Sequence, residues 1–480
     1  MIALWQSISP FLLPIYYVGI LFVVVNILLE NRNPLKTHSY LLLLLLLPFV
    51  GLIIYLFFGQ NHRKRKIMAK KQLINKAFGP AYIRDYLKHE ATDLTAHSQY
   101  DKLIRFLHKD LSPISLRNRI TVLHNGEEKF PALMEALDQA QHHIHIEYYI
   151  FDNDTIGIPL AELLLRKAQS GVQVRMIVDG VGSLSLRKAF FRKMRSGGVQ
   201  LEEYMPVLFP SFTSKINYRD HRKIVVIDGK TGFTGGMNID DRYVNSEQHK
   251  PYWRDTHLKI EGEAVKTLQF LFFLNWQFVN QETIKLSNDF FPVVSSVGNH
   301  CVQINASGPE LDLASIMDSF FIAITSARKS IRISTPYFIP TESILDAIIT
   351  AANSDIQVQL MIPFDSDSWI VQSASLSFIQ RLLDANVQVF LYQRGFIHAK
   401  VILIDDNFAS VGTANMDYRS FDLNHEVNTY IYDKGIVDTL QGQFDDDLTF
   451  CQKIDLVQWE KRSFKQKLKE SLCRLLAPLL

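Results

Sequence analysis

Cysteine is scarce in this sequence. Cys301, Cys451 and Cys473 are the only three among 480 residues, they lie far apart, and no Cys-x-x-Cys pair occurs. A disulfide framework and a zinc site built from thiolates are therefore excluded. No Walker-type loop and no Gly-x-Gly-x-x-Gly fingerprint stands out either, so nothing indicates a nucleotide cofactor.

Histidine offers one short cluster that a metal could use. His142, His143 and His145 stand together, and two of them alternate along an expected strand. No cysteine or carboxylate at ligand spacing accompanies them. We therefore expect no metal and no other cofactor, and no inhibition of the protein by a chelator.

Excess positive charge is missing from most of the chain. The net charge is +2, but residues 59–76 contain seven cations and no acid, and residues 30–36 add one more positive charge. Residues 77–480 consequently carry a net charge of −6. Nucleic acid binds clustered positive charge, so this composition argues against a nucleic-acid partner.

The sequence does contain two long uncharged runs near its start. Phe11–Leu29 and Tyr40–Phe58 are 19 residues each, with a short polar connection between them. At about 1.5 Å per residue, each run reaches roughly 28 Å, close to the hydrocarbon thickness of a bilayer. We therefore expect a transmembrane hairpin with spans at about 8–29 and 40–58. A cleaved signal peptide and a buried core helix are the alternatives, and the first run lacks the positive segment of a signal peptide.

The cations that follow the second run predict the orientation of the hairpin. Positive residues beside a span favour the cytoplasmic side, and they are attracted to anionic lipid head groups. We expect a multi-pass protein of the cell membrane whose following lobes are cytoplasmic.

The remainder of the chain runs twice through one pattern. Ala140–Phe151 aligns without a gap with Ala327–Phe338, and Val172–Val174 aligns with Ile356–Val358. Apolar strands that alternate with helices of 10–15 residues predict βαβ units and largely parallel sheets. Two copies predict an α/β fold of two similar lobes related by a pseudo-two-fold axis, although a chance alignment of apolar segments is the alternative. The expected organisation is a hairpin at 1–60, a basic segment and connector at 61–112, and lobes at 113–295 and 296–480.

Three strands separated by helices are expected in each pass. The strands expected in the first pass lie at 143–151, 172–179 and 199–204, and those in the second at 330–338, 356–363 and 387–392.

Each pass ends in the same string of polar residues around an apolar strand. A histidine, a lysine two residues later and an aspartate five residues after the lysine occur in both: His221, Lys223 and Asp228, then His398, Lys400 and Asp405. A Gly-x-x-Asn segment follows soon afterwards and ends at Asn238 and at Asn415. Side chains two apart leave the same face of a strand. Two copies brought together would place two imidazoles and two ammonium groups around one point, and this arrangement favours an anion such as a phosphodiester.

This doubled His-x-Lys-x-x-x-x-Asp motif resembles that of the phospholipase D superfamily over essentially residues 113–480. The flanking segments are similar to those of bacterial cardiolipin synthases over the whole chain: Asn217-Tyr218-Arg219, Pro48 and Gly51 in the second run, and the leucine-rich end at 475–480. The resemblance implies transfer of a phosphatidyl group from one phosphatidylglycerol to another, which gives cardiolipin and glycerol through a phosphohistidine intermediate. It implies phosphatidylglycerol and cardiolipin as partners in the membrane.

The resemblance also implies roles for individual residues. His221 is the expected nucleophile and His398 the expected general acid and base, although the symmetric sequence leaves the reverse open. The expected phosphate binders are Lys223, Lys400, Asn238 and Asn415. Asp228 and Asp405 are expected to organise the motif loops. A carboxylate should hold the second nitrogen of each imidazole: Glu426 for His398 and Asp255 for His221, with a surface salt bridge as the alternative for either acid.

Other functions and features stay open at this point. A phospholipase D-type hydrolase or a nuclease would use the same intermediate with water as the acceptor, and a non-catalytic protein could bind anionic lipid. Residues 459–480 mix cations with apolar residues, which is compatible with a helix on a membrane surface or with packing against the second lobe. The oligomeric state has no signal in the sequence.

Overall fold

The computed structural model describes residues 18–29, 34–55, 69, 71, 99–207, 217–246, 250–282, 284, 286–294, 297–311 and 314–480. The chain divides into two compact units. One comprises Met1–Ala69 with Phe209–Ser214, and the other comprises Lys70–Leu208 with Lys215–Leu480.

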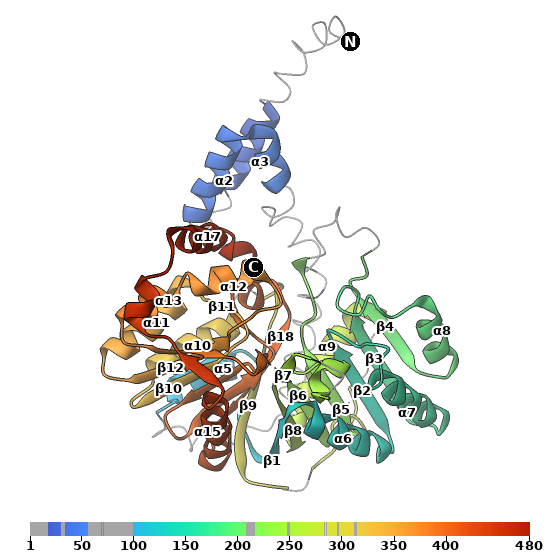
Figure 1. Cartoon of the computed structure of the whole chain (residues 1–480). Helices are drawn as coiled ribbons and strands as arrows, with labels where there is room; N and C mark the ends of the chain where they lie inside the picture. Colours follow the sequence, from blue (N-terminus) through green and yellow to red (C-terminus); the bar gives the residue numbers. More distant parts are fainter. Residues whose placement is uncertain are drawn as a thin grey trace, which may run out of the picture. The chain divides into compact units, whose positions relative to one another are not determined.

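The described residues of the first unit are mainly helical. A helix covers residues 18–29, and α2 (Pro34–Leu46) and α3 (Pro48–Ile54) follow it (Figure 1). The backbone leaves the helical region at Leu47, where φ is −133° and ψ is 69°. α3 then packs closely on α2, so that a Cβ at Gly51 would lie 2.7 Å from the carbonyl oxygen of Leu43. The helix is therefore interrupted within the segment 40–58, the expected second span, because the ring of Pro48 removes a backbone donor and crowds the preceding turn.

The described helices of this unit are short for a bilayer. No helix in the part of the chain that the structure describes is both long enough and apolar enough to cross a membrane. The beginning of the first expected span, residues 56–58 of the second span, and the basic run apart from Lys71 lie outside the described residues. Several described apolar side chains are more than half exposed: Val18, Phe22, Leu29, Leu45 and Phe49.

The second unit is built on one large mixed sheet. Its 15 strands have the order β19-β13-β12-β10-β15-β16-β18-β9-β1-β8-β6-β5-β2-β3-β4. Apart from β19, the order of equivalent strands is the same on either side of the β9–β1 contact. The strands from β1 to β4 in this order belong to the first lobe: β1 (Ser115–His124), β2 (His143–Tyr148), β3 (Gln173–Asp179), β4 (Gln200–Tyr204), β5 (Lys223–Ile227), β6 (Thr231–Gly235) and β8 (Thr256–Gly262). The strands from β19 to β9 belong to the second lobe: β9 (His300–Ser307), β10 (Ser330–Ser334), β12 (Gln357–Pro363), β13 (Gln388–Tyr392), β15 (Val401–Ile404), β16 (Phe408–Gly412), β18 (Glu426–Ile431) and β19 (Cys451–Lys453).

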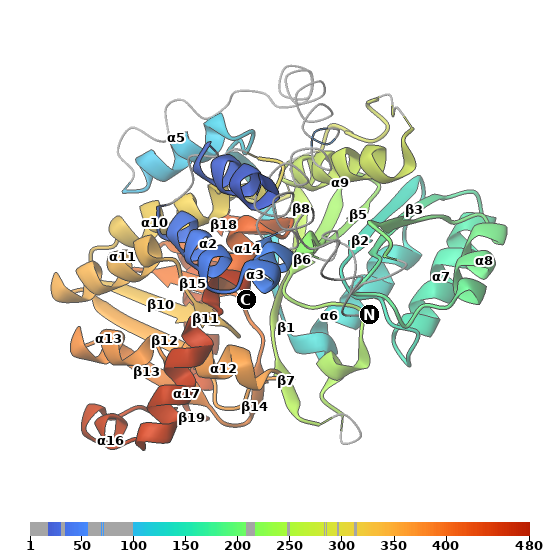
Figure 2. The same cartoon turned by 90° about the horizontal axis from the view of Figure 1, so that it is seen from above.

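Helices cover both faces of this sheet (Figures 1 and 2). Those of the first lobe are α6 (Asn125–Asp138), α7 (Gly157–Gln169), α8 (Lys188–Ser196) and α9 (Val265–Asn280). Those of the second are α10 (Ser315–Thr325), α11 (Glu342–Asn353), α12 (Trp369–Leu376), α13 (Ile379–Asp384), α14 (Tyr418–Asp422), α15 (Lys434–Leu448), α16 (Leu456–Glu460) and α17 (Phe464–Arg474). The repeated order of strands and helices gives the α/β fold of two similar lobes that the sequence predicts.

The two lobes are halves of one body, because β1 and β9 pair directly. The segment expected to be a connector also contributes to the second lobe. Within it, α5 (Asp101–Lys109) buries Leu103, Ile104 and Leu107 in the core of that lobe.

Within the large sheet, parallel pairing is confined to three strands in each lobe. β2, β3 and β4 are parallel, as are β10, β12 and β13. The motif strands β5 and β15 instead run antiparallel to their neighbours on both sides. The expectation of largely parallel sheets is therefore only half right, since turns as short as the three residues between β5 and β6 can join antiparallel strands alone.

Candidate active site

The two motif histidines lie just before strands at the junction of the lobes. β5 begins at Lys223 and β15 begins at Val401, so neither histidine is part of the motif strand itself. A short parallel contact with the other lobe fixes each one instead. The amide of His221 donates to the carbonyl of His425 over 3.0 Å, and the amide of His398 donates to the carbonyl of Arg254 over 2.7 Å.

These contacts bring each histidine beside an acid of the opposite lobe. β14 (Gly395–Ile397) pairs in parallel with β7 (Tyr252–Arg254), which ends directly before Asp255. Asp220 forms an isolated parallel bridge with His425, which directly precedes Glu426. In both cases, the histidine directly follows a residue that pairs with the other lobe, and the carboxylate directly follows the partner of that residue.

The histidine–carboxylate pairs are consequently crossed between the lobes. Nδ1 of His221 lies 3.0 Å from Oε2 of Glu426, and Nδ1 of His398 lies 2.7 Å from Oδ2 of Asp255. The expected assignment, Glu426 to His398 and Asp255 to His221, is wrong. It assumed that each acid serves the histidine of its own repeat, whereas the backbone pairing joins each histidine segment to the other repeat.

Each pair leaves one ring nitrogen of the imidazole for chemistry. An ionised carboxylate only accepts hydrogen bonds, so Nδ1 carries the proton and Nε2 keeps its lone pair. Glu426 is itself held in place, because Thr413 donates a short hydrogen bond to Oε2 and Asn424 donates to Oε1 over 3.1 Å. Residues of the second lobe therefore set the orientation of His221: Glu426 contacts the ring, and Thr413 and Asn424 hold Glu426.

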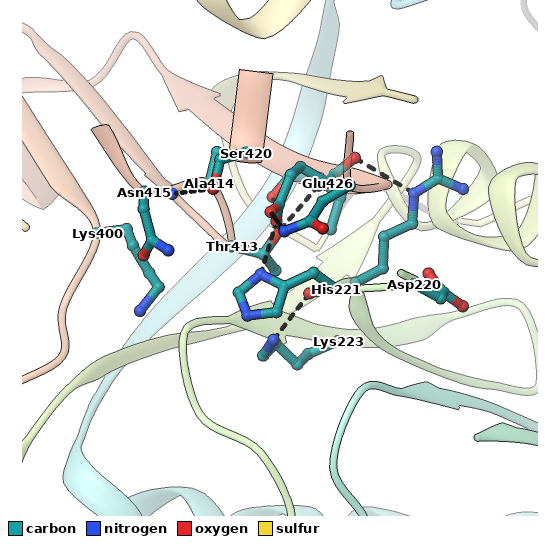
Figure 3. Close-up of polar contacts among 12 residues, drawn as sticks. Asp220, His221, Lys223, Lys400, Thr413, Ala414, Asn415, Ser420 and Glu426 are labelled. Carbon is teal, nitrogen blue, oxygen red and sulfur yellow. Dashed lines mark hydrogen bonds and ion pairs between the residues drawn. The ribbon is translucent and has the colours of Figure 1, made fainter. Parts of the chain in front are cut away.

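Both motif lysines are buried and lie close to the histidines. Nζ of Lys223 donates to the carbonyl of His221 over 2.7 Å, and Nζ of Lys400 donates to the carbonyl of His398 over 2.6 Å. Figure 3 shows Lys223 beside His221, with Lys400 and Asn415 of the second lobe across from them. Two ammonium groups and two imidazoles thus gather at the junction of the lobes.

Burial and mutual repulsion lower the pKa values of the bases in this site. The pKa of Lys223 falls to about 7 and that of Lys400 to about 8, chiefly because both groups are desolvated. Desolvation also lowers the pKa of His221 and, further, that of His398. Lys400 contributes to the shift of His221, and His221 contributes to the shift of His398, so the two copies of the motif share one electrostatic environment.

The two acids respond differently to the same environment. Burial raises the pKa of Asp255 to about 6, although Lys400 opposes this effect. Burial would also raise the pKa of Glu426, but the contacts with His221 and Lys223 outweigh it and hold that pKa below its usual value. The crossed pairs are therefore alike in geometry and unlike in electrostatics.

The two asparagines after the motif strands reach the same region. Oδ1 of Asn238 accepts from the amide of Ile150 over 3.2 Å, and its Nδ2 donates to the hydroxyl of Tyr243 over 3.0 Å. The amide of Asn415 donates to Oγ of Ser420 over 3.1 Å, while its side-chain Oδ1 is buried without a hydrogen-bond partner. A bound group that donates a hydrogen bond would satisfy Asn415.

The motif aspartates hold backbone rather than the other motif side chains. Asp228 accepts hydrogen bonds from the amides of Gln141, His142 and His143 over 2.8–2.9 Å. Asp405 accepts from three amides at the start of the equivalent strand, over 2.7–3.2 Å: Arg328, Lys329 and Ser330. These contacts join the end of each motif strand to the start of β2 or β10.

One glycine after the first motif strand is required by the site. A Cβ on Gly236 would lie 2.1 Å from Oδ1 of Asp255, which is the acid that holds His398. Any side chain at this position would therefore displace the carboxylate.

Several residues of the site carry no motif by which the sequence could identify them. Lys129 of α6 is fully buried, and its Nζ donates to the carbonyls of Met237 and Asn238. Trp253 and Phe396 lie beside His398, with ring centroids 5.3 and 5.9 Å from the imidazole. A lysine on an amphipathic helix and aromatic residues in short strands look like ordinary core or surface positions until the fold brings them together.

Of the histidine cluster at 142–145, His143 and His145 are buried in the first lobe, whereas His142 is exposed. Nε2 of His143 and Nδ1 of His145 lie 3.0 and 3.1 Å from Oε1 of Gln269, and the ring of His145 stacks on Phe272. Burial lowers the pKa of His143 to about 4. Among the residues that the structure describes, no group of three or more histidine, cysteine or acidic side chains could hold a metal ion.

Comparison with known proteins identifies the relatives of this chain. Residues 133–250 and 320–448 match the family model "Cardiolipin synthase, PLD-like domain". A cardiolipin synthase of Alkalihalophilus pseudofirmus is 43% identical over 470 residues, which cover 97% of this chain and 93% of that protein. The chain belongs to the cardiolipin synthase family. Cardiolipin synthase 2 of Bacillus anthracis is 41% identical over 457 residues, which cover 95% of this chain and 88% of that protein.

Membership of the cardiolipin synthase family confirms the resemblance drawn from the doubled motif. It also confirms the prediction that the protein is a phosphatidyltransferase. Residues 18–60 additionally match the model "Phospholipase_D-nuclease N-terminal". The crystal structure of phosphatidylserine synthase from Haemophilus influenzae Rd KW20 aligns with a TM-score of 0.61 at 15% identity, over 79% of this chain and 98% of that one. This alignment shows a common fold.

Proposed function

We propose that this member of the cardiolipin synthase family transfers the phosphatidyl group of one phosphatidylglycerol to a second one, and that a phosphohistidine forms on His221. The observation that carries the proposal is the crossed pairing, because each imidazole has Nδ1 held by a buried carboxylate and Nε2 left for the substrate. One nucleophile and one separate proton donor are what a phosphodiester with an alkoxide leaving group needs.

In the first step, Nε2 of His221 attacks phosphorus and the bond from phosphorus to the glycerol oxygen breaks. His398 gives a proton from Nε2 to that oxygen, so glycerol leaves as a neutral alcohol. His221 is favoured as the nucleophile because the ionised Glu426 stabilises the positive charge that the ring gains on attack. The negative charge of the bound phosphodiester favours the protonated form of His398 before this step.

In the second step, the terminal hydroxyl of another phosphatidylglycerol attacks the phosphohistidine. His398 takes the proton of that hydroxyl, the P–N bond breaks, and His221 returns to its starting form. The products are cardiolipin and the regenerated enzyme, so the proton that His398 gave in the first step is recovered in the second.

Four residues are proposed to bind the non-bridging oxygens of the phosphate: Lys223, Lys400, Asn238 and Asn415. Both lysines are buried, where an ammonium group stabilises developing negative charge more strongly than it does in water. Asp228 and Asp405 are proposed to act on the motif loops through the backbone amides that they bind.

We also propose that the first unit anchors the enzyme in the cell membrane as a multi-pass segment and that the lobes are cytoplasmic. The exposed apolar side chains of residues 18–50 support contact with lipid, and the cations in 63–76 support this orientation. Anchoring would raise the concentration of lipid substrate at the site.

The test uses the purified full chain with phosphatidylglycerol in mixed micelles, with the lipid products separated by chromatography. Cardiolipin and glycerol in equal amounts are expected. Phosphatidic acid as the sole product would replace the proposal with a hydrolase, and retained lipid binding without turnover would replace it with a lipid-binding protein. With lipid labelled in the phosphate, the wild-type enzyme should carry acid-labile label after a rapid quench, and His221→Ala should carry none.

A further inference from the structure

Helix α17 has two opposite faces of different character. One face packs on the second lobe, where Cys473 is buried and the buried carboxylate of Glu470 accepts from Arg462 over 2.6 Å. The other face presents a continuous apolar stripe at helical spacing, with residues that are 47–78% exposed: Phe464, Leu468, Leu472 and Leu475. Packing on the lobe accounts for the first face and leaves the stripe unexplained.

A neighbouring helix extends this stripe. Trp369 begins α12, which packs on α17, and its side chain is 60% exposed. Nζ of Lys469 lies 5.1 Å from the centre of the Trp369 ring. We call the surface formed by Trp369, Phe464, Leu468, Leu472 and Leu475 the α17 face.

The exposed charged side chains within residues 461–475 have one sign, whereas the exposed acids Asp365 and Asp367 precede Trp369. Four lysines in and beside the helix are exposed: Lys461, Lys465, Lys467 and Lys469. Within residues 461–475 the one acid is Glu470, which is buried and paired with Arg462. An apolar stripe bordered by exposed cations is the pattern of a helix that lies in the interface of an anionic membrane.

The α17 face also adjoins the rim of the candidate active site. Asp367, two residues before Trp369, accepts a hydrogen bond from the hydroxyl of Tyr337 over 2.7 Å. The ring of Tyr337 lies 6.3 Å from Phe396, and that of Phe396 lies 5.9 Å from His398. A membrane that touches Trp369 would therefore lie next to the side of the site where His398 stands.

We propose that the α17 face docks on the surface of an anionic membrane and sets the height of the His398 side of the site above the lipid head groups. This inference rests on the proposed function, since it gives a position to the same site. A second copy of the chain is a poorer occupant, because a symmetric contact would place the lysines of one copy against those of the other. The membrane supplies both the apolar phase and the negative charge that this surface matches.

The location of the α17 face is measured with a spin label on the full chain in vesicles. Leu472→Cys and, separately, Leu468→Cys are labelled with a nitroxide in a chain whose three native cysteines are alanine. In vesicles of phosphatidylglycerol and phosphatidylcholine, both labels should be more accessible to oxygen than to a water-soluble nickel chelate. A label at Lys193→Cys, an exposed position on α8, is the control and should show the accessibility of a site in water.

The label reports where the helix lies and not whether the enzyme turns over. The same result is expected in the His221→Ala background, so a failure of the proposed chemistry would leave this measurement unchanged. Lys465→Glu with Lys467→Glu should reduce the oxygen preference at position 472 in the anionic vesicles. Water-like accessibility at both 468 and 472 would overturn the proposal, as would a lipid signal that both charge reversals leave untouched.

Turnover gives a second readout. Leu468→Glu with Leu472→Glu should raise KM for phosphatidylglycerol in vesicles several-fold, with kcat retained, because the site meets its lipid less often. Val293→Glu, which places the same charge at an apolar residue that is 96% exposed elsewhere, should leave KM unchanged. If the double variant instead converts a dimer to a monomer in detergent and leaves KM at the wild-type value, the α17 face is a contact between copies and the proposal is wrong.

Discussion

Glu426 in the second lobe accepts a hydrogen bond from Nδ1 of His221 in the first, over 3.0 Å and across 205 positions of the sequence. The reciprocal contact, from His398 to Asp255, crosses in the other direction. Neither motif histidine is therefore paired with a carboxylate of its own lobe. The chemistry of the site depends on two parallel contacts between the lobes, β14 with β7 and Asp220 with His425.

The crossed pairs predict which carboxylate controls which histidine. Glu426→Gln should change the ¹⁵N signal of Nδ1 of His221 and leave that of His398 in place, because the amide no longer presents an ionised acceptor. Asp255→Asn should do the reverse. Each variant should lower kcat by about 10²–10⁴, as expected when an imidazole loses the acid that orients it.

Assignment of the two imidazole signals comes from His221→Gln and His398→Gln. Thr413→Val is the matched control for position, because it removes one hydrogen bond to Glu426 and leaves the carboxylate. It should shift the His221 signal less than Glu426→Gln does. If Asp255→Asn moved the His221 signal and Glu426→Gln moved that of His398, the pairing drawn here would be refuted.

The pKa values of the site predict a bell-shaped dependence of kcat/KM on pH. As the pH falls through about 6, Asp255 gains a proton and loses the negative charge that makes it a strong acceptor for His398, so activity should fall on the acid side. As the pH rises through the pKa values of Lys223, about 7, and Lys400, about 8, the ammonium groups lose the charge that binds the phosphodiester. Activity should therefore also fall on the alkaline side, and kcat/KM is the right measure because it reports the free enzyme.

Two variants separate these limbs of the pH profile. Lys223→Arg keeps its charge at high pH, so the alkaline limb should move upward from about 7 toward the pKa of Lys400, about 8, whatever the effect on the maximum rate. Asp255→Asn removes the group assigned to the acid limb and should flatten that limb in the residual activity. An alkaline limb that stays in place in Lys400→Arg and in Lys223→Arg would rule out the lysines as its cause.

The motif aspartates should act on stability. Asp228→Ala leaves three backbone amides without their acceptor, and Asp405→Ala does the same at the equivalent place. Each change should lower the free energy of unfolding by about 2–4 kcal/mol, the cost of stranding several donors. Asp406→Ala is a close control, because the half-exposed Asp406 makes only a 4.0 Å surface pair with Lys329.

Chemical denaturation of the detergent-solubilised chain measures these differences. Where Asp228→Ala and Asp405→Ala stay folded at low temperature, each should retain a substantial fraction of the wild-type kcat. The reason is that both aspartates bind backbone amides and not the phosphate. A loss of kcat as large as that of His221→Ala, with unchanged stability, would place these acids in the chemistry instead.

The sequence predicts those parts of the fold that depend on local periodicity. The expected strands at 172–179 and 356–363 correspond to β3 at Gln173–Asp179 and β12 at Gln357–Pro363. The doubled motif also predicts that two histidines and two lysines lie together, as they do, whereas their catalytic roles stay predictions. These successes share one cause: hydrophobic alternation and short motifs are properties of a few neighbouring residues.

What the sequence misses depends on contacts between distant segments. The partner of each histidine is decided by which strand ends lie side by side, as in the pairing of Ile397 with Arg254, and no repeat length encodes this. Lys129 is another example, because its helix position looks solvent-exposed until the loop at Met237 and Asn238 closes over it. The break at Leu47 has a different origin, because its cause, Pro48, is a local signal within a uniform apolar run.

The aromatic residues beside His398 should determine how much of the intermediate reacts with water. Trp253 contacts Phe396 and Tyr243 with ring centroids 4.7 and 5.5 Å apart, so one side of the imidazole is lined by rings. Trp253→Ala would open this side to solvent, and water would compete with the lipid hydroxyl for the phosphohistidine. The expected result is a rise of several-fold in the ratio of phosphatidic acid to cardiolipin, measured by chromatography of the lipid products. Phe321→Ala, at an exposed aromatic position on α10, is the control and should leave the ratio unchanged; an unchanged ratio in Trp253→Ala as well would show that other groups exclude water from the intermediate.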